Sequence, residues 1–264
     1  MSSFARPQWR IGSATDPGIK RRGRPNEDAL RIFQPRLDPR PPLIVLADGM
    51  GGHRGGALAS RIVVDSFERH YRQARSGLNA LELLGQLVQH CLEDLAQAAE
   101  RDESVGSMGS TVVAAVLGSE RVGVVNVGDS RAYLLREGEL RQISTDQSRV
   151  AELVRAGKIS AREADGHPER NALTMSLSPR RGAVTPMQAE TAVREGDVIL
   201  LCSDGLWSTL SPGEIQAVLS DLEPQPAADK LVALANTSQS ADNVSVIVAR
   251  LGRRGPAADD DTAN

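Results

Sequence analysis

Carboxylate residues stand where apolar runs of the sequence begin or end. The run LIVLA at 43–47 leads directly into an Asp-Gly pair, and VILLCSDG at 198–205 repeats the arrangement. A single Asp-Gly pair is ordinary turn chemistry, but carboxylates at the ends of several predicted strands would gather several anions at one edge of a sheet. The carboxylates concerned are Glu27, Asp28, Asp48, Asp129, Asp204 and Asp242.

Such a cluster favours a bound cation, because carboxylates in a partly desolvated cleft repel one another without one. The chain has only 4 histidines, and a ligand set made of oxygens is typical of Mg²⁺ or Mn²⁺ rather than Zn²⁺. Glycine after Asp48 lets the backbone, including the Gly49 carbonyl, come close to an ion. Two ions that share a carboxylate can activate a water and bind the oxygens of a phosphate ester. The sequence therefore predicts phosphate-ester hydrolysis.

The elements that must position these residues indicate an α+β domain. Helical periodicity predicts helices at 57–71, 80–101 and 212–222, and Ser211 can cap the last of these, which begins with a proline. Glu137-Gly138 predicts the turn of a β-hairpin. Short apolar runs bounded by glycine predict strands at 43–47, 111–118, 121–128, 131–144, 197–203 and 243–251.

The segment boundaries predict one domain. We expect residues 1–15 to form a lead-in, residues 16–251 a single catalytic domain, and residues 252–264 a disordered tail, since the tail is poor in apolar side chains. Residues 146–181 are polar and rich in arginine, so we expect a surface flap with a short helix near 150–156. Long insertions of this kind are usually functional.

Composition narrows the class of protein further. A chain of 264 residues with 40% hydrophobic and 25% charged side chains is typical of a soluble globular protein. Its net charge of -3 supplies no basic field, so we expect neither a nucleic-acid nor a membrane partner. Cys91 and Cys202 stand in separate apolar runs, which indicates buried thiols in a reducing compartment. The sequence shows no apolar leader, and we expect a cytoplasmic monomer.

Seven short motifs, in a fixed order, resemble one enzyme family. They are NEDA, ADGMGGHRGG, GSTVVAAVL, VGDSRAYLLREGELRQISTDQS, HPERNALT, LLCSDGLW and ADNVSVIV. Together they resemble the metal-dependent serine/threonine protein phosphatases of the phosphatase 2C type, the PPM family, in their compact bacterial form. The resemblance implies a four-layer αββα sandwich, in which two packed and mostly antiparallel β-sheets are flanked by helix pairs.

The resemblance also implies a centre that binds two Mn²⁺ or Mg²⁺ ions. Asp48 would bridge both ions, and Gly49 would contribute its carbonyl oxygen. Asp204 and Asp242 would hold one of the two ions.

Further roles follow from the same resemblance. Glu27 would hold the second ion through water, with Asp28 beside it. Asp129 matches a carboxylate that, together with Asp204, holds a weaker third metal in the bacterial enzymes. His53 occupies the position proposed to protonate the leaving alkoxide, which is a general-acid role.

The phosphate-binding arginine is where the chain departs from the family. Members usually carry it four residues before the metal-site glutamate, a position held here by Gly23. The segment RRGRPNED provides Arg21, Arg22 and Arg24 instead, and a planar guanidinium suits a phosphate dianion. We predict that Arg22 or Arg24 takes this role, with Arg21 as the remaining choice.

Two other functions compete with an active protein phosphatase. A pseudophosphatase that keeps the fold as a phosphoprotein-binding scaffold is disfavoured, because buried anions are costly once catalysis no longer needs them. An aspartyl-phosphate phosphatase of the haloacid dehalogenase type needs Asp-x-Asp, and Met50 removes the second acid. For an active enzyme, the resemblance implies phosphorylated proteins as partners, either bacterial Ser/Thr kinases or their substrates. WRIGSATDPG and LLCSDGLW also resemble phosphatases associated with type VI secretion, which adds components of that system as candidate substrates.

Overall fold

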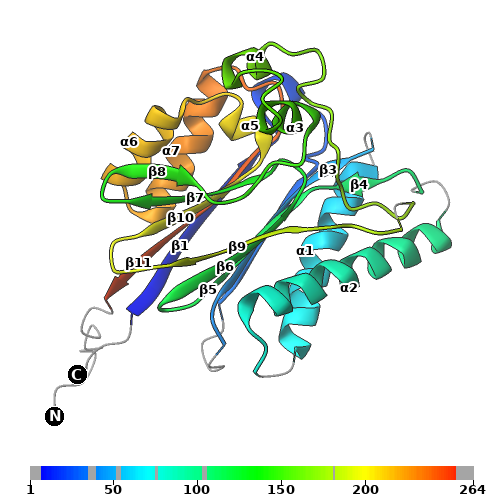
Figure 1. The fold of residues 1–264 in the computed structure, drawn as a ribbon, viewed down its shortest axis with the longest axis horizontal. Helices are drawn as coiled ribbons and strands as arrows, with labels where there is room; N and C mark the ends of the chain where they lie inside the picture. Colours follow the sequence, from blue (N-terminus) through cyan, green and yellow to red (C-terminus); the bar gives the residue numbers. More distant parts are fainter. Residues whose placement is uncertain are drawn as a thin grey trace, which may run out of the picture.

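Two antiparallel β-sheets pack face to face, and helices cover both outer faces (Figure 1). The computed structural model describes residues 7–34, 40–51, 55–74, 77–102, 106–180 and 182–253. This arrangement confirms the predicted α+β class and the four-layer αββα sandwich.

The first sheet carries the two chain-terminal strands. Its strand order is β1-β11-β10-β7-β8, and every neighbouring pair is antiparallel. The Glu137-Gly138 turn joins the last two strands, and both residues have positive φ, 51° and 78°, as the predicted hairpin requires. The five strands are β1 (Pro7–Asp16), β7 (Arg131–Arg136), β8 (Glu139–Gln142), β10 (Val198–Cys202) and β11 (Val244–Arg253).

The second sheet follows the order β2-β3-β5-β6-β9, with a short β4 paired to β3 beside this path. It contains three of the six predicted strand runs, those at 43–47, 111–118 and 121–128, which form β3, β5 and β6. Its members are β2 (Asp28–Phe33), β3 (Leu43–Met50), β4 (Gly109–Ser110), β5 (Val112–Leu117), β6 (Arg121–Val127) and β9 (Met187–Ala192).

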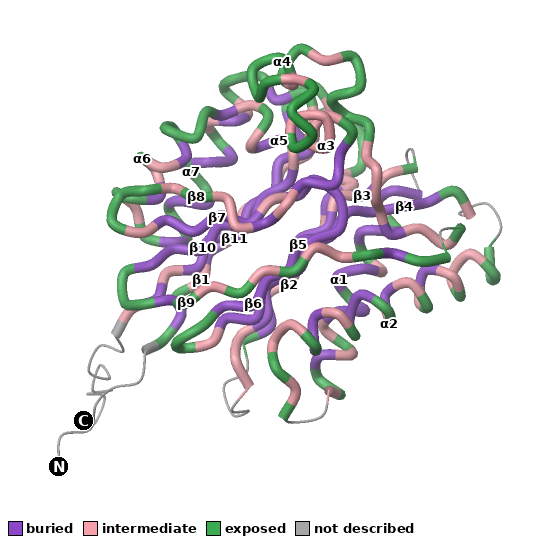
Figure 2. The backbone as a smooth tube through the Cα atoms, viewed as in Figure 1, coloured by how far each residue is buried: buried purple, intermediate pink, exposed green. Residues whose placement is uncertain are grey.

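Helix pairs cover the sheets in the way that the four-layer arrangement requires. Alternation along a strand sends neighbouring side chains to opposite faces: Ile44 packs between the sheets, whereas Val45 packs under the helices of its own sheet. The buried backbone in Figure 2 lies mainly along the strands at the centre of the molecule. The helices α1 (Gly55–Gln73) and α2 (Ala80–Arg101) cover the second sheet, and α6 (Pro212–Asp221) and α7 (Pro224–Thr237) cover the first.

The N-terminal boundary differs from the prediction. The expected lead-in at 1–15 overlaps β1, which pairs with β11 along its whole length, from Pro7 opposite Arg253 to Asp16 opposite Val244. No apolar run indicates this strand, because PQWRIGSATD has only two large apolar side chains, Trp9 and Ile11, among several polar ones. At the other end, β11 continues to Arg253, and residues 254–264 of the expected tail lie outside the described residues.

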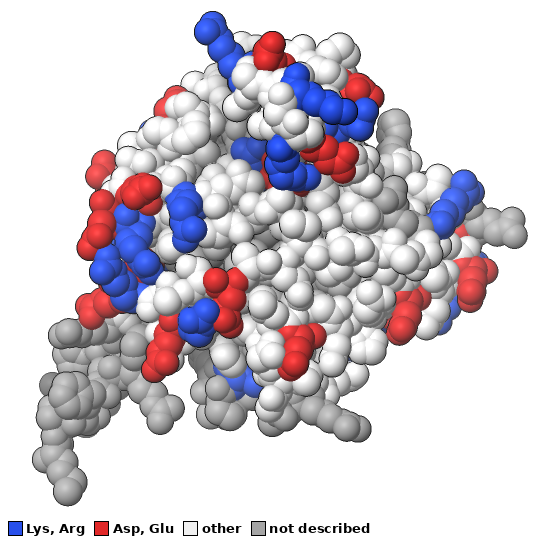
Figure 3. Space-filling view, viewed as in Figure 1, with Lys and Arg blue, Asp and Glu red and all other residues white. Residues whose placement is uncertain are grey.

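The expected flap at 146–181 contains two short helices, α3 (Arg149–Arg155) and α4 (Ala161–Asp165). Isolated bridges from Ser148 to Leu173 and from Ser110 to Leu177 tie the segment back to itself and to the sheet end. Charged side chains of both signs gather over these helices on the face drawn in Figure 3. Within the described residues, no helix has the length and apolar character to cross a membrane.

Candidate metal centre

Strand pairing brings the predicted carboxylates to one end of the sandwich. In the β2–β3 ladder, Asp28 lies directly opposite Asp48, so their side chains share a face of the sheet. From the other sheet, Asp204 opens the short helix α5 (Asp204–Trp207) just after β10, and Asp242 stands two residues before β11. The structure therefore unites four carboxylates that are far apart in the sequence.

Burial makes the charged form of these groups unfavourable. Desolvation, and then repulsion from Asp204 and Asp242, raises the pKa of Asp28 to about 7, although hydrogen bonds from Ser245 and Ser203 oppose the rise. Desolvation and repulsion from Asp28, the first of four repelling aspartates, raise the pKa of Asp48 well above 3.8. These shifts are those expected of anions packed together without enough positive charge.

The two remaining shifts have the same origin. The pKa of Asp204 is raised to about 6 by burial and by repulsion from Asp242. The pKa of Asp129 is raised to about 7 by burial and by repulsion from Asp204 and Asp146. Asp129 is thus electrostatically part of the cluster.

Several oxygens of the cluster are buried without a hydrogen-bond partner. They are Glu27 Oε1, Asp28 Oδ1 and Asp204 Oδ1. Buried polar atoms in proteins are nearly always bonded, and unshared carboxylate oxygens are the ligands that Mg²⁺ and Mn²⁺ prefer. Within the described residues, no three His, Cys, Asp or Glu side chains are arranged closely enough to hold one metal ion. Orphaned oxygens, raised pKa values and an all-oxygen donor set nonetheless fit a hard divalent cation.

The glycines after Asp48 permit a close approach of backbone to carboxylate. A Cβ atom on Gly49 would lie 2.0 Å from the Gly56 carbonyl oxygen. A Cβ atom on Gly56 would lie 2.6 Å from Glu27 Oε1 and 2.9 Å from the Gly49 carbonyl oxygen. All three distances are too short for a side chain, so glycine at these two positions allows the Gly49 carbonyl and the Glu27 carboxylate to lie close together.

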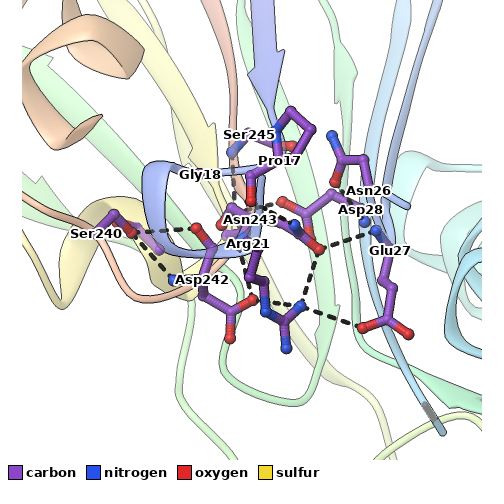
Figure 4. Close-up of polar contacts among 12 residues, drawn as sticks. Pro17, Gly18, Arg21, Asn26, Glu27, Asp28, Ser240, Asp242, Asn243 and Ser245 are labelled. Atoms are coloured by element: carbon purple, nitrogen blue, oxygen red, sulfur yellow. Dashed lines mark hydrogen bonds and ion pairs between the residues drawn. The ribbon is translucent and has the colours of Figure 1, made fainter. Parts of the chain in front are cut away.

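Arg21 is the arginine that reaches the cluster. Its Nη1 lies 3.1 Å from Glu27 Oε2 and 2.8 Å from Asp242 Oδ1 (Figure 4). The same atom donates a 3.1 Å hydrogen bond to Asn243 Oδ1. The sequence left three arginines as candidates, and the structure brings only this one, of the three, into contact with the carboxylates.

Arg22 and Arg24 do not make the contacts that Arg21 makes. Arg22 and Arg24 are exposed, and no ion pair among the described residues involves either side chain. The expectation that one of them binds phosphate stays a prediction. His53 lies at 52–54, outside the described residues.

Asn243 organises the site, although sequence analysis did not single it out. Its Oδ1 accepts the Glu27 backbone N–H at 2.9 Å as well as the Arg21 guanidinium, and its Nδ2 donates to the Pro17 carbonyl at 2.9 Å (Figure 4). One amide thereby fixes Glu27 and Arg21 relative to each other. Its position directly after Asp242, in ADNVSVIV, was the available signal.

Hydroxyl groups also connect the two sheets beside the cluster. Ser203 Oγ, from the end of β10, donates to Asp28 Oδ2 at 2.8 Å and accepts the Ser245 N–H at 3.0 Å. Thr111 Oγ1 pairs with Ser130 Oγ at 2.7 Å and accepts the Asp48 N–H at 3.1 Å. These buried bonds hold Asp28 and Asp48 in place from both sides.

Asp129 is joined to the flap. Trp207 Nε1 donates to the Asp129 carbonyl at 3.0 Å, and the Arg131 guanidinium carbon lies 3.6 Å from the centre of the Trp207 ring. Arg131 also forms a forked pair with Asp146, with bonds of 3.0 and 2.7 Å to Oδ2. Arg155 of α3 donates to the Asp146 carbonyl at 2.8 Å. The position of Asp129 is therefore linked to the first helix of the flap.

Comparison with known proteins agrees with this site. The family model described as Protein phosphatase 2C matches residues 17–245. A serine/threonine phosphatase stp of Listeria innocua is 34% identical over 230 residues, covering 84% of this chain and 89% of the relative.

Solved structures show the same fold. The catalytic domain of the serine/threonine protein phosphatase PstP, in complex with two manganese ions, has a TM-score of 0.80 and 34% identity, covering 93% of this chain and 99% of that chain. PppA of Pseudomonas aeruginosa, described as a key regulatory component of the type VI secretion system, has a TM-score of 0.75 and 32% identity over 92% of this chain and 97% of its own. The matched range contains all the carboxylates of the cluster, and the chain belongs to the protein phosphatase 2C family.

Proposed function

We propose that this chain is a metal-dependent phosphatase that removes phosphate from phosphoserine and phosphothreonine in proteins. The observation that carries the proposal is the cluster of buried carboxylates with orphaned oxygens, contacted by a single arginine. Metal-assisted phosphate-ester hydrolysis uses both features, since cations activate the water nucleophile and a guanidinium binds the substrate phosphate. Family membership and the named activity of the relatives support the same function.

The residues present fit two divalent ions. Asp48 would bridge them, and Asp204 and Asp242 would complete the ligands of one. When bound, Mn²⁺ or Mg²⁺ lowers the pKa of a water nucleophile and offsets the charge of the phosphate oxygens.

The remaining carboxylates would complete the centre. Glu27, acting through water, and the Gly49 carbonyl would hold the second ion, with Asp28 beside them. Asp129, together with Asp204, would hold a weaker third ion. The two manganese ions in the related PstP domain support the binding of two metal ions at this site.

The protein's own side chains would bind and orient the substrate. Arg21 can present two parallel N–H groups to a phosphate, and Asn243 holds its guanidinium at the mouth of the cluster. We assign the phosphate-binding role to Arg21 rather than to Arg22 or Arg24, because only Arg21 among them contacts the carboxylates. His53 stays our candidate for protonating the leaving alkoxide.

A pseudophosphatase is disfavoured by the energetics of the cluster. Orphaned buried oxygens on Asp28 and Asp204, together with their raised pKa values, destabilise the folded chain unless a cation relieves them. A scaffold without catalytic function would gain stability by replacing these residues. Their presence favours an active enzyme.

The finer biological setting follows by analogy with the relatives. Phosphorylated proteins are the substrate class, and we propose bacterial Ser/Thr kinases or their targets among them. The likeness to PppA supports components of type VI secretion as further candidates. We propose that the enzyme works in the cytoplasm as a monomer.

Hydrolysis of p-nitrophenyl phosphate, a phosphothreonine peptide and a phosphoserine peptide tests the function directly. We expect all three reactions to require added Mn²⁺ or Mg²⁺. Asp48→Asn should abolish them, because this substitution removes the ligand shared by both ions while keeping the side-chain volume. Undiminished hydrolysis in excess chelator would contradict the proposal.

A further inference from the structure

The segment between β1 and β2 carries positive charge that the metal centre does not use. Residues 17–25, PGIKRRGRP, contain four basic side chains and no acidic one. Arg21 contacts the carboxylates, whereas Lys20, Arg22 and Arg24 are exposed and have no ion pair among the described residues. We refer to these three residues as the basic turn.

The basic turn is fixed beside the metal centre at its start. The Gly18 N–H donates to Asp16 Oδ1 at 2.8 Å, and Asn243 Nδ2 donates to the Pro17 carbonyl at 2.9 Å. A Cβ atom on Gly18 would lie 2.1 Å from the Asp242 carbonyl oxygen, so the chain passes directly against a predicted metal ligand. The turn therefore has a defined place next to the site where phosphate would bind.

The tip of the turn projects into open space. The Arg24 N–H donates to the Arg21 carbonyl at 2.9 Å, which closes a tight turn with Gly23 at a φ of 84°. Apart from Gly23 and its two chain neighbours, no atom of the described residues lies within 4 Å of the point where a Cβ atom of Gly23 would be. The ends of such a turn lie within about 7 Å of each other. This distance is about the length of two residues in an extended peptide. Arg22 and Arg24 can therefore reach substrate residues one or two positions from a phosphate bound at Arg21.

We propose that the basic turn recognises acidic side chains that flank the phosphorylated residue of the substrate. This inference rests on the proposed function, because it needs the substrate phosphate at Arg21. With that phosphate in place, Asp or Glu one or two residues away would meet Lys20, Arg22 or Arg24. Lysine or arginine at the same substrate positions would be repelled.

The basic turn differs in its charges from the neighbouring flap. Charges of both signs cover α3 and α4 (Figure 3), so an approaching peptide meets compensating groups there. The basic turn carries one sign only, and exposed charges of one sign at a binding surface select partners of the opposite sign. The chain has a net charge of -3, so this preference is a local property of the turn rather than of the whole molecule.

Three phosphothreonine peptides that differ only in their flanking residues test the inference. One peptide carries Glu on both sides of the phosphothreonine, one carries Gln, and one carries Lys. We expect the wild-type kcat/KM to fall in that order, with about tenfold between the extremes, since an exposed ion pair contributes at most about fivefold. High salt should compress the ratio.

Charge reversal identifies the residues responsible. In the double variant Arg22→Glu/Arg24→Glu, the ratio of kcat/KM for the Glu peptide over the Lys peptide should fall to one or below. Lys230→Glu is the matched control, because Lys230 is exposed on α7 and forms no ion pair among the described residues. The control should keep the wild-type ratio. Hydrolysis of p-nitrophenyl phosphate, which has no flanking residues, reports whether each variant retains a working centre.

The outcomes separate this inference from the function beneath it. Equal kcat/KM for the three peptides with the wild-type enzyme would overturn the role of the basic turn and leave the phosphatase function standing. An equal change of the ratio in Lys230→Glu would assign the preference to overall charge and would also overturn it. Failure to hydrolyse all four substrates would overturn the proposed function and this inference with it.

Discussion

The indole N–H of Trp207 donates a 3.0 Å hydrogen bond to the backbone carbonyl of Asp129. The face of the Trp207 ring contacts Arg131. The Arg131 guanidinium stacks on this ring and pairs with Asp146 at the start of the flap. One aromatic side chain thus lies between a cluster carboxylate and a surface segment. A substitution of Trp207 should therefore affect the position of Asp129 at the metal centre more than it affects the stability of the fold.

Trp207→Phe tests this link. The variant keeps an aromatic ring under Arg131 but leaves the Asp129 carbonyl without its donor. We expect the free energy of unfolding to fall by about 1 kcal/mol and kcat on a phosphopeptide to fall roughly tenfold through misplacement of Asp129. Trp9→Phe is the matched control, since Trp9 Nε1 donates to the Gly118 carbonyl at 2.9 Å at the other end of the sandwich. Equal kcat in both variants would show that Trp207 only stabilises the fold.

Ser203→Ala should weaken metal binding. The substitution removes the 2.8 Å hydrogen bond to Asp28 Oδ2, on a carboxylate whose other oxygen is already without a partner. Loss of such a supporting bond typically costs about tenfold or more in metal affinity, measurable by calorimetric titration with Mn²⁺. Ser60→Ala is the control, because Ser60 is buried in α1 and, among the described residues, its hydroxyl bonds only to the Ala57 carbonyl of the same helix. Unchanged Mn²⁺ affinity in Ser203→Ala would contradict the prediction.

Asp129→Ala distinguishes the binding of the two main metal ions from the binding of the weaker third metal ion. We expect the variant to bind two divalent ions by calorimetry but to lose most of its turnover on a phosphopeptide, because the third ion would assist the reaction rather than build the site. A different result would follow if Asp129 merely stabilised the turn before β7. In that case a thermal scan would show a lower Tm, and turnover at a permissive temperature would be near normal.

Arg21→Lys should raise KM for phosphopeptides more than it changes kcat. Lysine keeps the positive charge beside Glu27 and Asp242 but cannot offer two parallel N–H groups to a phosphate. The loss of one charge-assisted hydrogen bond corresponds to roughly tenfold in KM. Arg10→Lys, on β1 and paired with Glu223, is a control that should leave KM unaltered. A normal KM in Arg21→Lys would return the phosphate role to another group.

The metal-free protein should lose stability as the pH rises through the range of the raised pKa values. Asp28 and Asp129 have folded-state pKa values of about 7, against an ordinary value of 3.8. The folded state therefore holds more protons than the unfolded state between these values, and its free energy of unfolding falls as the pH rises.

The isosteric variant Asp129→Asn isolates this effect. In chelator, its stability should equal that of the wild type near pH 4 and should exceed it increasingly up to pH 7, as measured by urea unfolding. A constant difference across this range would show that the Asp129 carboxylate does not titrate there.

The sequence predicted the strands and helices of strong pattern and could not predict the weak ones. The helix at 80–101 agrees residue for residue with α2, whose apolar stripe and Asn79 capping box leave little choice of boundary. Helix α7 went unpredicted, since it begins PQPA and its short apolar side chains give a faint stripe. Strand β1 owes its place to pairing with β11, a contact between residues more than two hundred positions apart.

The candidate site also combines residues that the sequence predicts with residues that it does not predict. Its carboxylates could be predicted from their positions at strand ends, because an apolar run followed by an Asp-Gly pair can be recognised in the sequence alone. The choice of Arg21 over Arg22 and Arg24 depends on the path of one tight turn against Asp242. Asn243 and Ser203 act through bonds between the sheets, and no local pattern reports such bonds.

The pairing of β1 with β11 bears on how the molecule can be engineered. Pro7 and Arg253 are register partners, and the start of β1 and the end of β11 lie on the side of the sandwich away from α3 and α4 (Figure 1). A short peptide linker between these ends would close the chain into a ring without crossing the mouth of the carboxylate cluster. New termini opened at the Glu137-Gly138 turn would then yield a circular permutant in which β1 and β11 become one covalent hairpin.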